Sequence, residues 1–445
     1  MNSWINHPQL QQWAEKLFQN LRQNESLGLS LNAEDSQFIR FNQSRIRQAT
    51  QVRQIHLEMR LQRDQREAKK SLFLGLDGDE NHRQLSAALE EMRALIEIMP
   101  ADPFFVPQKN HGQSAFSQKG RGIDANSLVD LLGDSLKGLD LAGLFCSGPM
   151  ISAQINSQGL DHWFETDSFF FDYSLYSGRK AAKGHYASSQ WVDEDFRRGL
   201  KLCQSQLELL GRPLCPVQLP GQYRTFLAPA AAYDMLSLLG WGGLSYSSFR
   251  QGQSTLGRLF KGEQSLSPQL FMEENFTRGL VPRFNDQGEL APETLPLIEG
   301  GKGVQMLVSS RTAAEYQVPA NAAISWESFR SLKVSPGQLP SSEVLSHLEK
   351  GLYLSNLHYL NYSDLPAGRF TGMTRYACFW VEGGEVQGPI QDLRFDESFY
   401  QALGPQLLAL TQETELFPNL STYQSRSFGL VETPGLLIEG FSFKA

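Results

Sequence analysis

Apolar residues near the start of the chain recur every three or four positions, the spacing of one helix face. The members of this stripe are Leu10, Trp13, Ala14, Leu17, Phe18 and Leu21. A second stripe, from Leu85 to Met99, predicts another helix, which Pro100 ends. Between the two stripes, Gln54–Leu61 alternates strictly between apolar and polar residues, which predicts a half-buried strand. We expect Ser71–Leu76 to be its antiparallel partner, across a polar turn near Arg63–Lys69.

Further elements follow in the first half of the chain. Gln108–Arg121 is polar and rich in Gly, Ser and Gln, so we expect an exposed connection there. After it the pattern predicts, in order, a helix at Ser127–Leu139, strands at Leu144–Ile155 and Trp163–Tyr176 joined by the turn Asn156–Gly159, and a helix at Phe196–Leu210. The first half is therefore predicted to mix helices with an antiparallel sheet.

The texture changes at Gly211–Gly221, where three prolines mark a candidate domain boundary. Beyond it Gly and Pro recur often, and the expected elements are a strand at Tyr223–Leu227, a helix at Ala230–Leu239, a tight hairpin at Gly383-Gly384 and a closing strand at Leu436–Phe443. The sequence thus predicts an α+β protein. Residues 1–215 form a mixed α/β domain with an antiparallel sheet and flanking helices, and residues 216–445 form a predominantly antiparallel β domain.

Composition narrows the class of protein. The 445 residues are 41% hydrophobic and 20% charged, as in ordinary globular proteins, and the net charge of -8 gives no general attraction to nucleic acid or anionic membrane. The first residues lack a basic segment followed by an apolar one, and no apolar run is long enough to cross a bilayer. The four cysteines are widely spaced, which argues against a disulfide framework. We therefore expect a cytoplasmic protein that makes no membrane contact.

The residues by themselves reveal no catalytic centre. A zinc peptidase helix needs two histidines one turn apart and a glutamate, but no two of the eight histidines are three to five residues apart. There is no nucleophile elbow, and the Gly240–Gly243 cluster has the wrong spacing for a phosphate cradle. The run Ser245–Ser248 has no adjacent histidine and is typical of a loop. We accordingly predict no catalytic and no metal-binding residue in this chain.

One basic segment leaves two interpretations open. Between Arg40 and Lys70 there are nine Lys or Arg residues against three acids, which suits either a nucleic-acid-binding arm or the solvated face of strands. Phe41 is the one aromatic residue of this segment, so few side chains are available to stack on nucleic-acid bases. We favour the solvated strand face.

Several motifs in the second half carry a family resemblance. These are TGMTR at Thr371–Arg375, FWVEGGEV at Phe379–Val386 and LRFDES at Leu393–Ser398, preceded by a block from Gly351 through Asn361. More loosely, Glu34–Ser36, Arg40–Asn42, Ser44–Gln48 and Gln251–Glu263 agree as well. Together they resemble the TldD/PmbA metallopeptidase family, and the TGMTR and RFDES pieces resemble its TldE-like branch.

The resemblance implies a role without catalysis. In TldD-type members a helix after the boundary strand carries HExxxH, and a later cysteine completes the zinc site. The corresponding helix here, Ala230–Leu239, has no histidine, its one acid is Asp234, and Tyr423–Leu437 has no cysteine. The resemblance therefore implies that zinc belongs to a TldD-type partner subunit carrying HExxxH, while this chain helps to enclose a cavity that admits unfolded peptide.

Two hypotheses for function remain open at this point. The first is a non-catalytic TldE-type subunit of a two-subunit zinc peptidase, inactive alone, that processes peptides or unfolded segments. The second is a stand-alone peptide-binding or scaffolding protein without peptidase activity. For either one, Asn361 and Arg375 in the motif-rich block are candidate peptide-binding residues, although we favour hydrogen bonding within hairpins and turns as their role.

Overall fold

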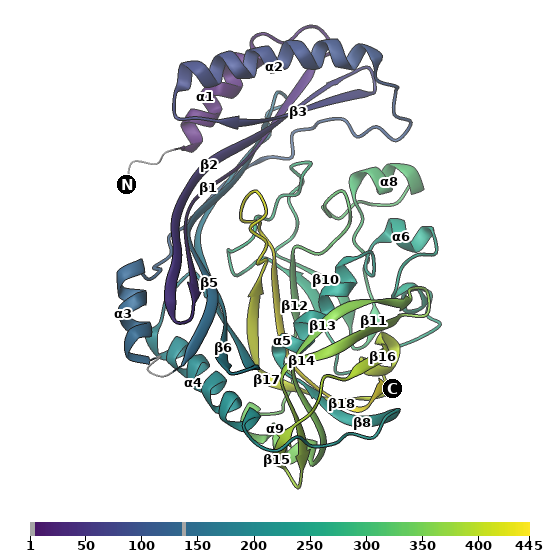
Figure 1. Cartoon of the computed structure of the whole chain (residues 1–445). Helices are drawn as coiled ribbons and strands as arrows, with labels where there is room; N and C mark the ends of the chain where they lie inside the picture. The colour runs from purple at the N-terminus through teal and green to yellow at the C-terminus, as the bar shows by residue number, and fades with distance from the viewer. Residues whose placement is uncertain (1–4, 136–138) are drawn as a thin grey trace.

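The computed structural model describes residues 5–135 and 139–445 and has the α+β architecture that the sequence predicts (Figure 1). The first sheet uses β1 (Ser26–Asn42), β2 (Arg45–Arg63), β3 (Arg66–Leu74), β4 (Gln113–Gln118), β5 (Asp140–Asn156), β6 (Asp161–Ser177) and β7 (Lys180–Ser188). Its order is β3-β2-β1-β5-β6-β4, with β7 also paired to β6. Every pairing is antiparallel except β4 with β6.

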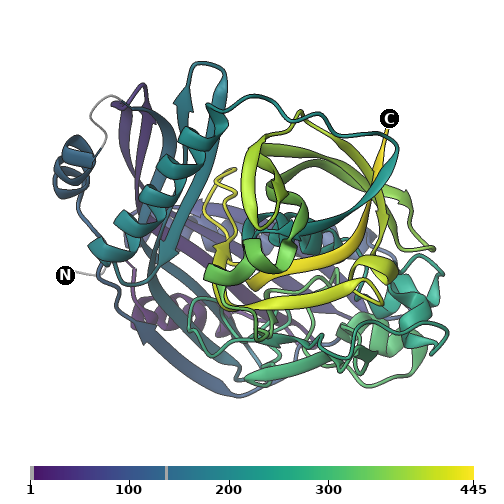
Figure 2. The ribbon, with the colours of Figure 1, turned by 90° about the horizontal axis from the view of Figure 1, so that it is seen from below.

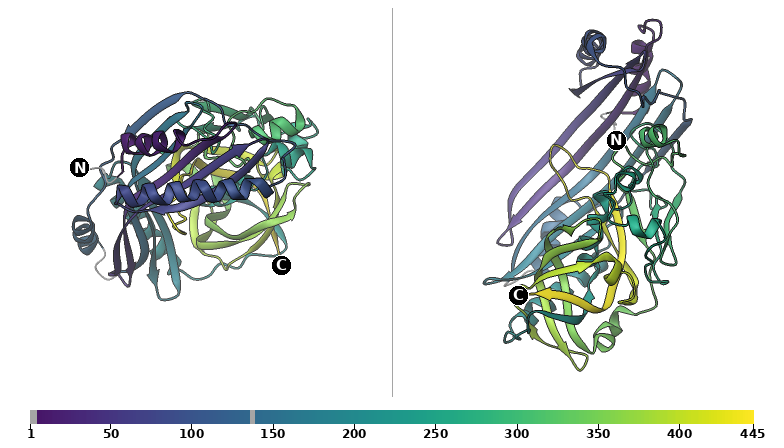
Figure 3. Two further views of the ribbon diagram at one scale, coloured as in Figure 1. Left: turned by 90° about the horizontal axis from the view of Figure 1, so that it is seen from above. Right: turned by 90° about the vertical axis from the view of Figure 1, so that its right-hand side faces the viewer.

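Helices cover one face of this sheet. α1 (His7–Phe18) and α2 (Gly78–Ile98) lie across the upper part of the strands (Figure 3, left), and α3 (Ala125–Ser135) and α4 (Asp193–Leu210) pack lower down. Most odd-numbered residues of β1 point into this covered face and are buried: Leu27, Leu29, Leu31, Ala33, Ile39 and Phe41. The period of two in a strand then directs the even-numbered residues to the opposite face.

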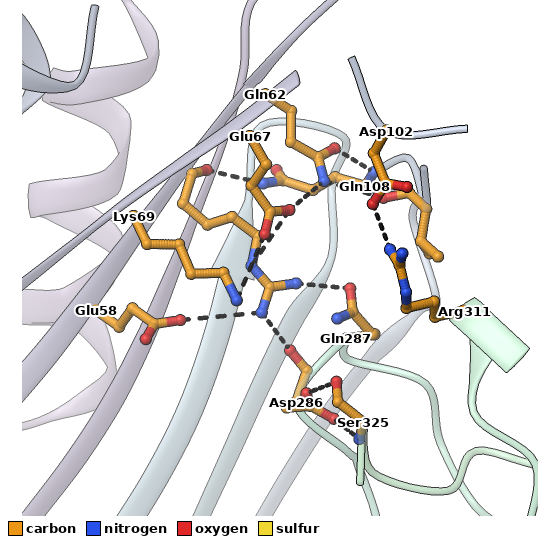
Figure 4. Close-up of polar contacts among 12 residues, drawn as sticks. Glu58, Gln62, Glu67, Lys69, Asp102, Gln108, Asp286, Gln287, Arg311 and Ser325 are labelled. Carbon is orange, nitrogen blue, oxygen red and sulfur yellow. Dashed lines mark hydrogen bonds and ion pairs between the residues drawn. The ribbon is translucent and has the colours of Figure 1, made fainter. Parts of the chain in front are cut away.

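That opposite face is polar, and the second half of the chain covers it. Its buried residues include Glu34, Ser36, Arg60, Gln62, Gln154 and His162. Arg60 donates to the Gln287 side chain at 2.6 Å and to the Asp286 carbonyl at 3.2 Å (Figure 4). The prediction of a solvated strand face is therefore wrong at Arg60, although Arg45 and Arg47 at the other end of β2 are exposed. We call this surface the polar inner face.

Five strands of the second sheet close into a barrel. The sheet consists of β8 (Gly221–Leu227), β9 (Met272–Asn275), β10 (Thr294–Glu299), β11 (Lys302–Gly303), β12 (Ser331–Val334), β13 (Lys350–Asp364), β14 (Arg369–Glu382), β15 (Glu385–Pro389), β16 (Arg394–Ser398), β17 (Leu407–Pro418) and β18 (Leu430–Lys444). β18, β16, β14, β13 and β8 pair in sequence, and β8 pairs again with β18, which closes a ring seen nearly end on in Figure 2. Closure removes most free edges.

Short helices accompany this second sheet: α5 (Pro229–Ser237), α6 (Tyr246–Arg250), α7 (Gly257–Phe260), α8 (Ser310–Tyr316), α9 (Val344–Leu348) and α10 (Phe399–Ala402), with 3-10 turns at Leu238–Gly240 and Ser341–Glu343. The halves also meet at α4, which packs on β6 and β7 and touches β14 and β15. Within residues 5–135 and 139–445, no helix is long and apolar enough to span a membrane.

Local predictions were mostly confirmed, with a few corrections. The exposed connection expected at Gln108–Arg121 contains β4, and the turn expected near Arg63–Lys69 is only Asp64-Gln65. The loop expected at Ser245–Ser248 begins α6, because Ser245 accepts the Ser248 amide as a helix cap. The expected helix at Ser127–Leu139 is present to Ser135, but residues 136–138 lie outside the described part. The domain division at 215/216 stays a prediction.

Candidate functional site

Helix α5 lies between the barrel and the polar inner face, at the position where the resemblance expects the zinc helix. Pro229 begins it at a position where the missing amide proton costs nothing. Ala231, Ala232, Met235 and Leu236 fill the core of the second half. Tyr233 and Asp234 remain on the side that faces the first sheet.

A cavity of about 130 Å³ separates α5 from the first sheet. It is lined by Phe170, Phe171, Asp172, Lys183, Gly184, His185, Ala187, Ala230, Tyr233, Asp234, Asn356, Phe417, Pro418 and Leu420. All of these residues except Leu420, which follows β17, come from β6, β7, α5, β13 and β17, so the site combines both halves of the chain. We call it the α5 cavity.

Asp234 is the buried carboxylate of the α5 cavity. Its Oδ2 accepts the backbone N–H of Leu357 at 2.9 Å, shortly after a shift in the β13–β14 register between Leu354 and Asn356. Burial raises the pKa of Asp234 to about 7, although the Leu357 amide, the Lys183 charge and the Asn356 side chain act in the opposite direction. The carboxyl group therefore exchanges its proton near neutral pH.

Lys183 forms an ion pair across the two neighbouring strands of the first sheet. Its Nζ lies 2.8 Å from Asp172 Oδ1 and 3.0 Å from Oδ2. Burial by itself disfavours the charged form, but the charge and hydrogen bonds of Asp172 prevail and raise the pKa of Lys183 above its usual value. The α5 cavity thus contains a permanent ammonium group that belongs to the chain.

Aromatic rings form another wall of the α5 cavity. The rings of Tyr233 and Phe417 stack with centroids 4.6 Å apart, and the His185 ring lies 4.3 Å from that of Phe417. His185 Nε2 is 3.6 Å from Glu415 Oε2, outside normal hydrogen-bonding distance. A wall of this kind suits apolar side chains, while Asp234 and Asn356 offer acceptors and donors to backbone amides.

In the part of the chain that the structure describes, no three His, Cys, Asp or Glu side chains are grouped so that they could hold a metal ion. All four cysteines are free; Cys146, Cys203 and Cys378 are buried, and Cys215 is half-buried. That this chain binds no zinc in solution stays a prediction.

The two candidate residues from the sequence lie on the β13–β14 hairpin and do not line the α5 cavity. Asn361 is exposed and accepts the Tyr362 amide at 2.8 Å. Arg375 is exposed, and its guanidinium lies 5.3 Å from the centroid of the Tyr376 ring. A role for either residue in peptide binding stays a prediction.

Sequence reasoning missed the contribution of the first half to this cavity. Asp172 is the one charge in the apolar run Phe169–Tyr173, and an acid within such a strand is a signal that could have been noticed. Lys183 and His185 carry no comparable signal, because alternating polar residues are ordinary on a strand.

Comparison with protein-family models identifies the family to which the chain belongs. The profile described as "PmbA/TldA metallopeptidase C-terminal domain" matches residues 220–445, just over half of the 445 residues. The chain therefore belongs to the TldD/PmbA metallopeptidase family, as its motifs had suggested.

Solved structures share the whole fold. TldE from Thermococcus kodakarensis superposes with a TM-score of 0.81 and 14% identity, over 98% of this chain and 100% of that chain. A candidate DNA gyrase modulator from Thermotoga maritima gives 0.77 and 13% over 98% and 100%, and one from Bacteroides thetaiotaomicron gives 0.75 and 15% over 98% of each. At these identities the likeness establishes the fold alone. No curated protein matches the chain.

Proposed function

We propose that the chain is the non-catalytic, TldE-type subunit of a two-subunit zinc metallopeptidase that processes peptides or unfolded polypeptide segments. The observation that carries the proposal lies at α5. Where the family resemblance expects HExxxH, this helix has no histidine and presents Tyr233 and Asp234 to the cavity. Zinc, on this proposal, is supplied by a TldD-type partner.

The charges of the α5 cavity support this assignment. A catalytic zinc site needs three protein ligands and an open position for water. Lys183 lines the same cavity as Asp234, and its ammonium is already paired with Asp172. A divalent cation near these carboxylates would be repelled by Lys183, so the cavity favours a polypeptide over a metal ion.

The size and lining of the site support contact with polypeptide. The α5 cavity, at about 130 Å³, has room for one side chain and its flanking amides and not for a folded partner. An extended segment could also add to one of the sheet edges that remain outside the closed barrel. The chain would then help to enclose substrate without cleaving it.

Purification of the chain alone and together with an HExxxH subunit tests the proposal. We expect the lone chain to bind less than stoichiometric zinc and to leave an unfolded casein substrate intact. The pair should co-elute, contain zinc and cleave the substrate. A partner whose HExxxH glutamate is changed to glutamine is the matched control, and it should co-elute without activity. Stoichiometric zinc and peptidase activity in the lone chain would contradict the proposal.

The alternative is a stand-alone peptide-binding or scaffolding protein, which the same cavity would also suit. The co-elution experiment separates the two. A stable homodimer that ignores every HExxxH subunit offered would favour the stand-alone protein, whereas a stoichiometric complex would favour the peptidase subunit.

A further inference from the structure

The loop between β17 and β18, residues 419–429, leaves the second half of the chain and rests against the polar inner face; it is the yellow loop that rises from these strands in Figure 1. We call it the strap. Within it only Arg426 is buried, at 8% exposure, while Tyr423 is 84% exposed. Arg426 is therefore the one fully buried attachment of the strap, and the half-buried Phe428 adds a ring contact with Phe164 at 5.5 Å between centroids.

The Arg426 guanidinium is held by four uncharged oxygen atoms of the first sheet. Nη1 donates to Ser36 Oγ at 3.3 Å and to the Gly148 carbonyl at 3.1 Å. Nη2 donates to the Ser168 carbonyl at 3.1 Å and to Ser168 Oγ at 2.7 Å. A guanidinium is planar and donates from several nitrogen atoms, so it reaches acceptors on two sides at once. The single ammonium nitrogen of a lysine cannot make the same set of bonds. We call these residues the cradle.

The cradle also recognises the backbone of the arginine. Glu34 Oε1 accepts the Arg426 N–H at 3.3 Å. The same carboxylate accepts from Ser36 Oγ at 2.7 Å and from the Gln54 amide at 2.6 Å, so its position is fixed before the strap arrives. Gln54 in turn donates to the Gln424 carbonyl at 2.7 Å. Main chain and side chain are therefore bound together, as in recognition of an extended peptide.

An irregularity in the first sheet shapes the cradle. The β1–β5 ladder pairs Glu34 with Met150 and Gln37 with Ser147, and between these pairs β5 has Gly148 and Pro149. Pro149 has no N–H to donate to a ladder. Gly148 has a φ of +137°, and a Cβ there would lie 2.2 Å from the Asp35 carbonyl oxygen, so only glycine fits. At this gap in the ladder the Gly148 carbonyl accepts a hydrogen bond from Arg426.

Open space surrounds the strap. Cavities of about 30 Å³, 200 Å³ and 330 Å³ adjoin it, on the side of β6 and β7, on the side of β1 and β2, and toward Trp326. Phe428 of the strap lines all three, and Arg426 lines the first two. The first also shares Phe170 and Pro418 with the α5 cavity. Displacement of the strap would join these cavities into a groove that runs to α5.

We infer that the cradle is a guanidinium-binding subsite for an arginine of an extended peptide, and that the strap is an internal ligand that occupies it until it is displaced. A fixed structural anchor would be packed on all sides, whereas the strap has cavities on both sides and one buried side chain. The inference rests on the proposed function in one respect: it names arginine-containing extended peptides as the ligand class of the same face.

Binding of a synthetic copy of the strap to the full chain tests the inference. The probe is a fluorescein-labelled peptide of residues 419–430, measured by anisotropy against the wild-type chain and the Arg426→Ala variant. We expect the variant to bind at least about tenfold more tightly, because no internal ligand competes for its cradle. The same peptide with alanine in place of its arginine should bind at least about tenfold more weakly than the original.

Two controls keep the result decisive. Arg224→Ala removes an arginine that pairs with Glu439 outside the cradle, and this variant should bind the probe as the wild type does. Should Arg426→Ala fail to fold, Arg426→Gln, which retains an amide donor and most of the side-chain volume, replaces it. The inference is overturned if Arg426→Ala binds the probe no more tightly than the wild type does. It is also overturned if replacing the arginine of the probe leaves its affinity for the variant unchanged. The assay needs neither partner nor zinc, so its failure is distinct from failure of the proposed peptidase role.

Discussion

The α5 cavity and the cradle lie on the same polar inner face but bind their charges in different ways. In the α5 cavity an ammonium faces two carboxylates, and one of these, Asp234, has a pKa of about 7. In the cradle a guanidinium is held by carbonyl and hydroxyl oxygens. The first site should therefore respond to pH, whereas the second should respond only to competing donors.

The largest expected effect comes from Asp234→Asn. Because burial raises the pKa of Asp234 from 3.8 to about 7, the folded state binds the proton more tightly than the unfolded state. The wild-type free energy of unfolding therefore falls as the pH rises from about 4 to about 7, by at most about 1.4 kcal/mol per pH unit. The asparagine variant lacks this loss, so its advantage should grow with pH. Urea unfolding at several pH values measures it.

Glu432→Gln is the control of opposite sign. Burial alone would raise the pKa of Glu432, but hydrogen bonds from Arg278 and Thr414 lower it overall. The contribution of Glu432 to the free energy of unfolding is therefore present at pH values above its pKa in the unfolded state. It is lost as the pH falls through the lower pKa of the folded state. An Asp234→Asn difference that stays constant with pH would contradict the assignment of the α5 cavity as the titrating site.

The next effect in size is that of Arg426→Ala. Loss of the charged hydrogen bonds in the cradle should lower the free energy of unfolding by about 2–3 kcal/mol. Burial lowers the pKa of Arg426 below its usual value. A guanidinium nevertheless stays charged near neutrality and its acceptors here are uncharged, so the loss should be equal at about pH 6 and pH 8. Hydrogen exchange should accelerate in residues 419–429 and not in α5. Faster exchange throughout the second half would show that the strap is an integral part of the core.

The smallest effect is expected at Arg60, the other buried arginine between the halves. Its neighbours Glu58 and Glu67 are about one-third exposed and lie 3.9 Å and 3.8 Å away, so solvent weakens those ion pairs. Arg60→Ala should cost about 1 kcal/mol, mainly through the bonds to Gln287 and Asp286. Urea unfolding of Arg60→Ala and Arg426→Ala under the same conditions measures the two losses in the free energy of unfolding and hence their ratio. A larger loss at Arg60 would reverse the ranking of the two contacts.

Local signals predicted the elements that depend on local structure. The stripes of α1 and α2, the C-terminal end of α4 and the hairpin at Gly383-Gly384, where both glycines have positive φ, follow from residues close in sequence. β4 was missed because it pairs in parallel with a distant strand and has no apolar alternation of its own. Parallel pairing leaves no turn sequence by which to recognise it.

The candidate site was beyond the sequence for a related reason. Three separate strands and a helix bring together Asp172, Lys183, Asp234 and Asn356. The spacing of these residues in the sequence does not predict the cavity. The sequence shows that α5 has no histidine pair. For the basic segment Arg40–Lys70 the pattern predicts a solvated strand face, because an alternating strand does not reveal whether water or protein covers its polar side. Only tertiary structure distinguishes the two.

The position of β18 has a consequence for how the molecule is made. This strand, residues 430–444, pairs with β8, β12, β16 and β17, all of which precede it in sequence. The barrel therefore cannot close until these residues have left the ribosome, long after β8 at Gly221–Leu227 has emerged. Until then β8 and β16 each lack the neighbour that β18 provides and present open edges during synthesis. We expect a nascent chain stalled before residue 430 to depend on chaperones, while its first sheet is already formed.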